Sequence, residues 1–217
     1  MPNDRPRMII VLATESPSDA IWGRIRMLAD EIFAGPVAVK FAYYGREGTG
    51  ATRRPCIATN WITVADDWTD IVDQGRVDCI CGCFMQTDDF LTQALRETQK
   101  TTVQAVVVLG SFHGKLDTAV ATTKLLRVAG TRVFCFQQDR SSSTERAFRA
   151  LAEIGGGAFY RINPHVDLIA ERLPRLMQAV THYATGGMAA LEAQGDEPAN
   201  LLLEQMTAAD RMLARSR

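Results

Sequence analysis

The sequence predicts an α/β protein with a doubly wound, Rossmann-like and mostly parallel sheet that carries helices on both faces. Short apolar runs alternate with segments whose apolar residues recur at helical spacing, in an order that gives six strands. This alternation is typical of a parallel sheet with crossover helices. Several of the runs are continuously apolar, as in strands buried on both faces. The 217 residues can bury one sizeable core, so we expect one globular unit.

The first quarter of the chain predicts three of these strands. The apolar run at residues 8–13 ends in hydroxyl and carboxyl side chains, which indicates a buried strand whose loop opens a helix. A glycine-proline pair ends that helix, and the alternating residues 37–44 predict a strand that is more exposed than the first. Residues 53–61 contain a proline and favour a strand at the edge of the sheet.

The remainder of the domain continues the alternation. A polar helix at residues 63–73 is expected to turn Val64 and Trp68 inward, and Thr87 or Asp88 is expected to cap the helix that follows. Further strands are expected at residues 103–111, 131–138 and 158–162, and further helices at 114–129, 144–154 and 166–184.

Two of these helices have informative ends. The helix at 114–129 begins its apolar stripe at Leu116, and the helix at 144–154 runs into three glycines. One of these glycines is expected to take a positive φ as the helix C-cap. The glycine run is not predicted to bind phosphate, because it follows a helix and precedes a strand, the reverse of a phosphate loop.

The chain changes character beyond Gly187, so we expect a domain at residues 1–187 and an amphipathic helical tail at 188–217. The apolar stripe of the tail consists of Leu201, Leu202, Met206, Ala209 and Met212 or Leu213. Docking of this stripe on its own domain is the preferred interpretation. The alternative is that the helix builds the interface of a homo-oligomer.

Composition limits the classes of partner and compartment. A net charge of −1 and scattered Lys and Arg give no reason to expect nucleic acid. The apolar run near the start is too short for a signal peptide or a membrane span, which favours a cytoplasmic protein without a membrane partner. The five cysteines are an odd number in a chain without a predicted export signal, which indicates free thiols rather than a set of disulfides. The alternating Cys79, Cys81 and Cys83 lack zinc-site spacing and are interpreted as small buried side chains.

Three segments of the second half together resemble a von Willebrand factor type A domain: V-V-V-L-G-S, G-T-R-V-F-C-F-Q-Q and A-F-R-A-L-A-E-I-G-G-G-A-F-Y-R-I. In that family a helix leads through a glycine pair into a short strand with an aromatic residue. The residues that match this pattern are Phe148, Arg149, Leu151, Ala152, Gly156, Gly157, Phe159 and Tyr160. The run Y-A-T-G-G-M-A-A-L-E is similar to the end of bacterial cytoplasmic members. The resemblance covers about residues 7–192, whereas 45–84 match little.

The resemblance implies five parallel strands, one short antiparallel edge strand and a metal-ion-dependent adhesion site at the carboxyl ends of the strands. That site takes Asp-x-Ser/Thr-x-Ser from the loop after the first strand, a Thr from a second loop and an Asp at the end of the strand that here is V-V-V-L-G-S. Oxygen ligands of this kind suit Mg²⁺.

This sequence departs from that pattern at both aspartates. The first loop can align as Leu12, Thr14, Ser16 or as Thr14, Ser16, Ser18, and neither register supplies a carboxylate. Ser111 stands where the family has its second Asp, and Thr87 matches the middle Thr. The carboxylates near enough in sequence to substitute are Glu15, Asp19, Asp88, Asp89 and Asp117. We therefore expect a degenerate site with no tightly bound metal and no cofactor beyond a weakly held Mg²⁺.

The function that these patterns favour is a non-enzymatic module that binds a partner protein through its strand-end loops. The residues expected to form the binding surface are Thr14, Ser16, Ser18, Thr87 and Ser111. The alternative is a small-molecule- or nucleotide-binding α/β protein or a hydrolase that uses the same crevice. Ser111, His113 and Asp117 are the candidate residues for that alternative, although they do not form a nucleophile elbow.

Overall fold

The computed structural model describes residues 5–13, 26–33, 35–44, 56–70, 86–162 and 169–215. Thr14, Ser16, Ser18, Glu15, Asp19 and the three cysteines at 79–83 lie outside these residues. The predictions made for them stay predictions.

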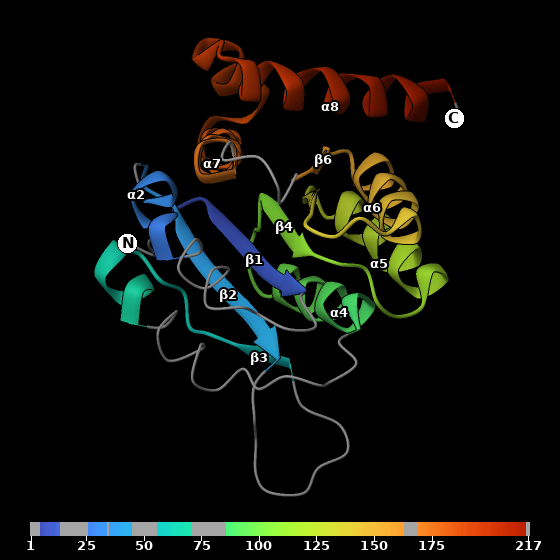
Figure 1. Ribbon diagram of the computed structural model, residues 1–217, viewed down its shortest axis with the longest axis horizontal. Helices are drawn as coiled ribbons and strands as arrows, with labels where there is room; N and C mark the ends of the chain where they lie inside the picture. Colours follow the sequence, from blue (N-terminus) through green and yellow to red (C-terminus); the bar gives the residue numbers. More distant parts are fainter. Residues whose placement is uncertain are drawn as a thin grey trace, which may run out of the picture.

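A six-stranded sheet in the order β3-β2-β1-β4-β5-β6 forms the centre of the molecule (Figure 1). Five strands are parallel, and β3 runs antiparallel to β2 at one edge. The predicted sheet is therefore confirmed, including its antiparallel edge strand. The strands are β1 (Arg7–Ala13), β2 (Ala38–Tyr44), β3 (Cys56–Ala58), β4 (Ala105–Gly110), β5 (Arg132–Gln137) and β6 (Phe159–Arg161).

Helices cover both faces of the sheet, as a doubly wound topology requires. On one face the core is closed by α2 and α7, with α8 behind them, and on the other by α4, α5 and α6. Their bounds are α2 (Ala29–Ile32), α4 (Thr87–Thr98), α5 (Leu116–Val128), α6 (Ser142–Gly155), α7 (Ile169–Gln194) and α8 (Glu197–Arg215). Among the described residues, none of these helices is both long and apolar enough to cross a membrane. The cytoplasmic location stays a prediction.

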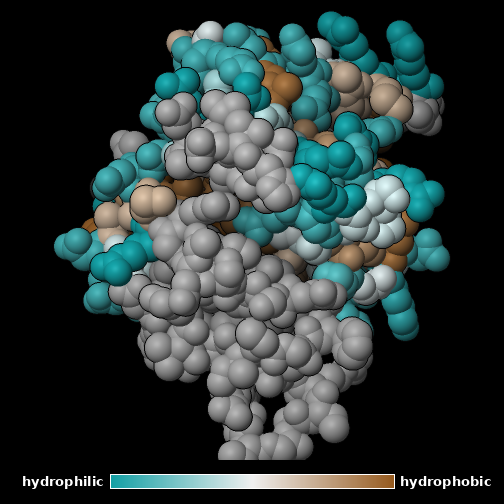
Figure 2. Space-filling view, viewed as in Figure 1, coloured by the Kyte–Doolittle hydropathy of each residue, from teal (hydrophilic) through white to brown (hydrophobic). Residues whose placement is uncertain are grey.

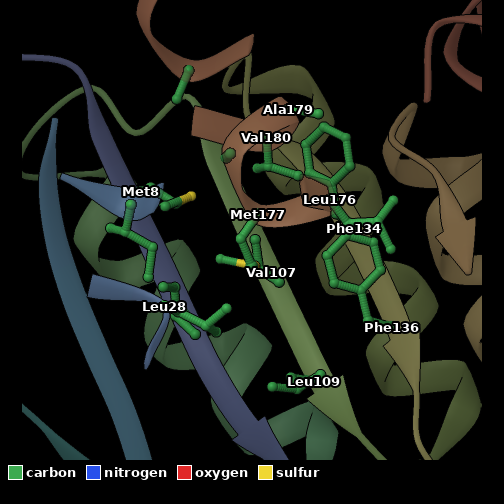
Figure 3. Packing of buried hydrophobic residues seen from close by; sticks show 14 of the residues in the cluster. Met8, Leu28, Val107, Leu109, Phe134, Phe136, Leu176, Met177, Ala179 and Val180 are labelled. Carbon is green, nitrogen blue, oxygen red and sulfur yellow. The ribbon is translucent and has the colours of Figure 1, made fainter. Parts of the chain in front are cut away.

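The central strands are apolar throughout because each of their two faces meets a layer of helices. Successive residues of a strand point to opposite faces, so Met8 and Ile10 pack on the α7 side whereas Ile9 packs on the α4 side. Figure 3 shows side chains of β4 and β5 packed against α7, including Phe134 and Met177. The continuous apolar runs in the sequence thus reflect burial on both faces.

Local signals fix both ends of α6, which begins at Ser142, two residues before the predicted start. The hydroxyl of Ser141 accepts a hydrogen bond from the backbone N–H of Thr144 at 3.3 Å, which caps the helix. Gly156 takes φ 65° at the C-cap, so the predicted positive-φ glycine is confirmed. The sequence therefore encodes this helix and its two ends locally.

Four details of the sequence interpretation are wrong. Strand β2 is as buried as β1 in its described side chains, because Val39 and Phe41 pack with Trp68 in the core of one face and Ala42 packs in the core of the other. Val64 and Leu116 are exposed rather than inward, since each lies at the very start of its helix, outside the part that packs on the sheet. Thr87 and Asp88 lie inside α4, whose N-cap position is Gln86 with no side-chain cap.

Helix α8 is part of the domain core rather than an appended tail. Figure 1 shows it running across α7 toward the α6 side of the molecule, and at the top of Figure 2 its outer surface is mostly hydrophilic. Leu202 and Met206 are fully buried in the same cluster as Met8 and Phe134. The preferred docking of the tail on its own domain is confirmed. Its boundary at Gly187 falls at a kink inside α7, with φ 69° and ψ −155°.

The prediction of the apolar stripe is wrong at its C-terminal end. Met212 and Leu213 are 50% and 38% exposed, because α8 extends here beyond the sheet edge that its inner face covers. The stripe that could have formed an oligomer interface is largely used within the chain, and the homo-oligomer stays a prediction.

Two polar contacts fix the position of α8. The side-chain amide of Gln205 accepts from the N–H of Phe159 at 2.9 Å and donates to its C=O at 3.0 Å, so it pairs the open side of edge strand β6 as a neighbouring strand would. Asp210 accepts two hydrogen bonds from Arg132, at 2.8 and 3.0 Å, and pairs with Arg127. Burial alone would raise the pKa of Asp210, but these guanidinium groups hold it below its ordinary value.

Candidate functional site

The carboxyl ends of β1, β4 and β5 lie side by side at one edge of the sheet. Ala13, Gly110 and Gln137 are register partners across these strands, so the loops that follow them start next to one another. Ligand sites of open α/β sheets lie at this edge. We refer to it as the carboxyl edge.

Gly110 is required where β4 leaves the sheet. Its φ is 133°, and a Cβ atom there would lie 1.9 Å from the carbonyl oxygen of Ala13. The close approach lets the N–H of Ser111 donate to the same carbonyl at 2.6 Å. The backbone thereby directs Ser111 into the carboxyl edge, beside the end of β1.

Thr87 joins the start of α4 to the loop after β4. Its N–H donates to the carbonyl of His113 at 2.6 Å, and its hydroxyl accepts from the N–H of His113 at 3.2 Å. The hydroxyl is also 3.5 Å from the carbonyl of Ser111, to which it donates. Thr87 is 1% exposed. The structure thus brings Thr87 and Ser111 together, as the sequence pattern suggested, and shows the Thr87 hydroxyl engaged with backbone.

Asp139 is a carboxylate of this edge that the sequence interpretation missed. It follows β5, and its Oδ1 accepts from Gln137 Nε2 at 2.6 Å and from the N–H of Ser141 at 3.1 Å. Its Oδ2 accepts from the hydroxyl of Thr144 at 2.8 Å. The signal was present, because Asp139 is a polar residue directly after a buried strand, as Ser111 is.

The donors around Asp139 keep it ionised. Burial alone would raise the pKa of this carboxyl, but Gln137, the hydroxyls of Ser111 and Thr144, and the N–H of Ser141 together lower it. Since Thr144 also accepts from the N–H of Phe112 at 3.4 Å, this network joins the loop after β4 to the start of α6.

Asp88 occupies the same edge in a different way. It is 5% exposed, and its Oδ1 is buried with no hydrogen-bond partner among the residues that the structure describes. A Cβ atom at Gly114, where φ is 114°, would lie 2.1 Å from this oxygen, so only a glycine leaves room for the carboxylate. Buried oxygens without hydrogen-bond partners are uncommon, because an unpaired buried oxygen lowers the stability of the folded state.

Comparison with models of known protein families finds no match, and comparison with curated protein sequences finds none either. Solved structures do match. A von Willebrand factor type A protein from Catenulispora acidiphila aligns with a TM-score of 0.62 over 84% of this chain and 43% of its own length, at 12% identity. The chain has the fold of a von Willebrand factor type A domain.

Two further solved structures align with this chain. BatB from Bacteroides thetaiotaomicron aligns over 81% of this chain and 98% of its own, with a TM-score of 0.55 and 13% identity. The pilus adhesin SpaC from Lactobacillus rhamnosus GG aligns over 83% of this chain and 30% of its own, with a TM-score of 0.60 and 10% identity. At such low identities the similarity establishes the fold alone.

The described residues do not fit the divalent-ion site that the type A resemblance implies. Asp139 already accepts three hydrogen bonds, and the Thr87 hydroxyl is bound to backbone on both sides. Asp89 and Asp117 are exposed. Within the described part of the chain, no group of three or more His, Cys, Asp or Glu is arranged to hold a metal. Asp88 Oδ1 is free of hydrogen bonds to described residues, but a divalent ion needs several free oxygens at one point. Asp88, Thr87 and Asp139 together do not offer them.

The residues proposed for a hydrolase are not assembled into a catalytic group. The Ser111 hydroxyl lies beside Asp139, and in the described structure no hydrogen bond links it to His113 or Asp117. An activated serine requires a base within hydrogen-bond reach. The described groups of the carboxyl edge therefore bind one another rather than form reactive pairs.

The outer rim of the carboxyl edge is accessible. Asp89, Lys115 and Arg140 are exposed around the network, and Leu116, at the start of α5, is 41% exposed. This part of the rim therefore exposes both an apolar side chain and charged ones.

Proposed function

We propose that this protein is a non-enzymatic interaction module that binds a partner protein through the loops at the carboxyl edge, without a tightly held metal. The observation that carries the proposal is the hydrogen-bonded junction of Thr87 with Ser111 and His113. This junction fixes the loop after β4 against the start of α4 before any partner arrives.

An ordered surface favours binding because little conformational entropy is lost on association. The Asp139 network extends the ordered region to the start of α6. The absence of an assembled nucleophile and base among the described residues gives no support to catalysis.

Leu116 provides the most direct test, because α5 carries a matched control. Leu116 lies at the carboxyl edge, whereas Leu125 lies near the other end of the same helix and is 54% exposed. Both leucines are accessible, so Leu116→Asp and Leu125→Asp introduce the same charge into similar surroundings. Only the first alters the proposed binding surface.

The experiment compares the proteins that the wild type and both variants capture, after crosslinking, from cells that express the protein. Quantitative mass spectrometry is expected to show partners that the wild type and Leu125→Asp retain and that Leu116→Asp loses by roughly tenfold, since a central apolar contact contributes more than about 1 kcal/mol. Equal capture by the two variants would contradict binding at the carboxyl edge.

Chelator addition tests the metal-free part of the proposal separately. Capture is expected to be the same in a chelator and in excess Mg²⁺, because the Thr87 hydroxyl and the Asp139 carboxylate are engaged in internal hydrogen bonds. No group of three or more His, Cys, Asp or Glu among the described residues is arranged to hold an ion. Loss of the Leu116-dependent partners in the chelator would show that an ion completes the binding surface.

A further inference from the structure

A small pocket lies away from the carboxyl-edge network, between β6, the first turns of α7 and the start of α8. Its volume is about 120 Å³. Leu176, Pro198 and Leu201 form its apolar lining. Its polar lining is given by Tyr160, Arg172, Arg175 and Glu197. The pocket therefore pairs an apolar floor with two guanidinium groups.

Arg172 is oriented by two partners across the pocket. Its Nη1 donates to the phenol oxygen of Tyr160 at 2.6 Å, and its Nη2 lies 3.2 Å from a carboxylate oxygen of Glu197. Because the Tyr160 oxygen accepts this bond, its own proton is available to a ligand. Glu197 is mostly exposed and shows that a carboxylate can approach Arg172 in this geometry.

Arg175 lies one turn further along α7, on the same side of the helix. No hydrogen bond or ion pair joins it to another described residue, and it is exposed at the pocket. Two guanidinium groups face one carboxylate among the described lining residues, which leaves one positive charge unbalanced. A planar guanidinium binds a carboxylate with two parallel hydrogen bonds.

We propose that this pocket binds a small organic monocarboxylate, with the carboxylate on Arg175 and the Tyr160 hydroxyl and an apolar group against Leu176, Pro198 and Leu201. The unbalanced charge calls for one negative charge. The small volume suits a compact ligand, since pockets for drug-sized ligands occupy roughly 300 Å³ or more. The proposal does not depend on the function proposed for the carboxyl edge.

The test uses the full-length protein and two probes of the same shape, 3-methylbutanoate and its neutral amide. Saturation-transfer NMR titrations are expected to show millimolar binding of the acid and binding of the amide that is weaker by roughly tenfold, because the amide lacks the charge-assisted hydrogen bonds. The acid is also expected to raise the midpoint of thermal unfolding, since it binds the folded chain.

Arg175→Gln is the diagnostic variant, because Arg175 has no described contact whose loss would disturb the fold. It is expected to weaken binding of the acid by roughly tenfold, whereas Arg211→Gln, an equal change of charge at an exposed position on α8, leaves binding unchanged. Tyr160→Phe keeps the ring and is expected to weaken binding several-fold. Equal binding of acid and amide, full binding by Arg175→Gln, or no binding by the wild type would each overturn the proposal.

Peptides ending in leucine distinguish the two sources of such a carboxylate. A tripeptide with a free C-terminus that binds more tightly than the free acid would identify a chain terminus as the ligand. Weaker binding of the peptide would identify a free small acid. In either case, amidation of the C-terminus is expected to abolish binding of the peptide. Binding of the amidated peptide would overturn the proposal that the pocket recognises a carboxylate.

Discussion

The packing of helix α8 and the carboxyl edge both bring together residues that are far apart in the sequence, but different forces hold them. Helix α8 is anchored by fully buried apolar side chains such as Leu202 and Met206, with Asp210 bound to arginines at its far end. The carboxyl edge is held by hydrogen bonds around Thr87 and Asp139. The first is a piece of the core, and the second is a polar junction between loops.

The magnitudes of these forces separate structure from function. Burial of a leucine side chain contributes about 2 kcal/mol or more. A hydrogen bond between neutral groups, such as those of Thr87, contributes about 1 kcal/mol net, and one to the ionised Asp139 contributes about 1.5–3 kcal/mol. Substitutions on the inner face of α8 should therefore lower the stability of the domain without changing its exposed surface. Changes at the rim of the carboxyl edge should leave the fold intact, which is the property expected of a binding surface.

The largest loss of stability is expected for Leu202→Ala. This variant tests the comparison, because it would have little effect if α8 were not packed on the domain. Removing this buried side chain leaves a cavity in the core and should lower the free energy of unfolding by about 2–4 kcal/mol. Leu213→Ala, at a position 38% exposed on the same helix, should change it by less than about 0.5 kcal/mol. Urea unfolding followed by circular dichroism measures both, and equal effects would show that α8 is not docked.

A smaller effect is expected at the carboxyl edge, where two aspartates differ in their partners. Asp139→Ala leaves Thr144 and Gln137 short of an acceptor and should cost about 1–3 kcal/mol. Asp88→Ala removes an oxygen that bonds to no described residue, so it should cost less or stabilise the fold. Thermal unfolding of the two variants at neutral pH makes the comparison, and a larger loss for Asp88→Ala would contradict it.

The Asp139 effect should also depend on pH. The pKa of Asp139 is lowered in the folded state, so its stabilisation is present above the unfolded-state pKa of about 3.9 and is lost as the pH falls through the lower folded-state pKa. The difference between the wild type and Asp139→Ala should therefore shrink in urea titrations carried well below about pH 3.9. A constant difference would mean that the carboxylate charge contributes nothing.

The smallest loss of stability is expected for Gln205→Ala. This variant tests whether the Gln205 side chain protects the open edge of β6. Loss of the paired hydrogen bonds to Phe159 should cost about 1 kcal/mol and speed hydrogen exchange of the Phe159 amide. Glu204→Ala alters the exposed neighbour and should leave that amide protected. Unchanged exchange in Gln205→Ala would show that the edge is protected by burial alone.

The sequence interpretation succeeded where a property belongs to a short stretch and failed where it depends on the neighbours. The apolar runs of β1, β4 and β5 and the glycine C-cap of α6 are local, and each was predicted. Asp139 was missed because its importance lies in donors from two loops and a helix start. Leu116 was placed inward because helical spacing gives the direction of a side chain but not where the sheet beneath it ends.

What the sequence alone determined is the order of the elements and hence the type A fold, because period and apolar content decide which segments form strands and which helices. The tertiary structure alone decided that Gln205 pairs with Phe159, that Thr87 is committed to the loop of Ser111 and His113, and that Arg172 and Arg175 share a pocket with α8. Those contacts join residues far apart in the chain, and no local pattern specifies them because each depends on how two separately encoded elements come to lie against each other.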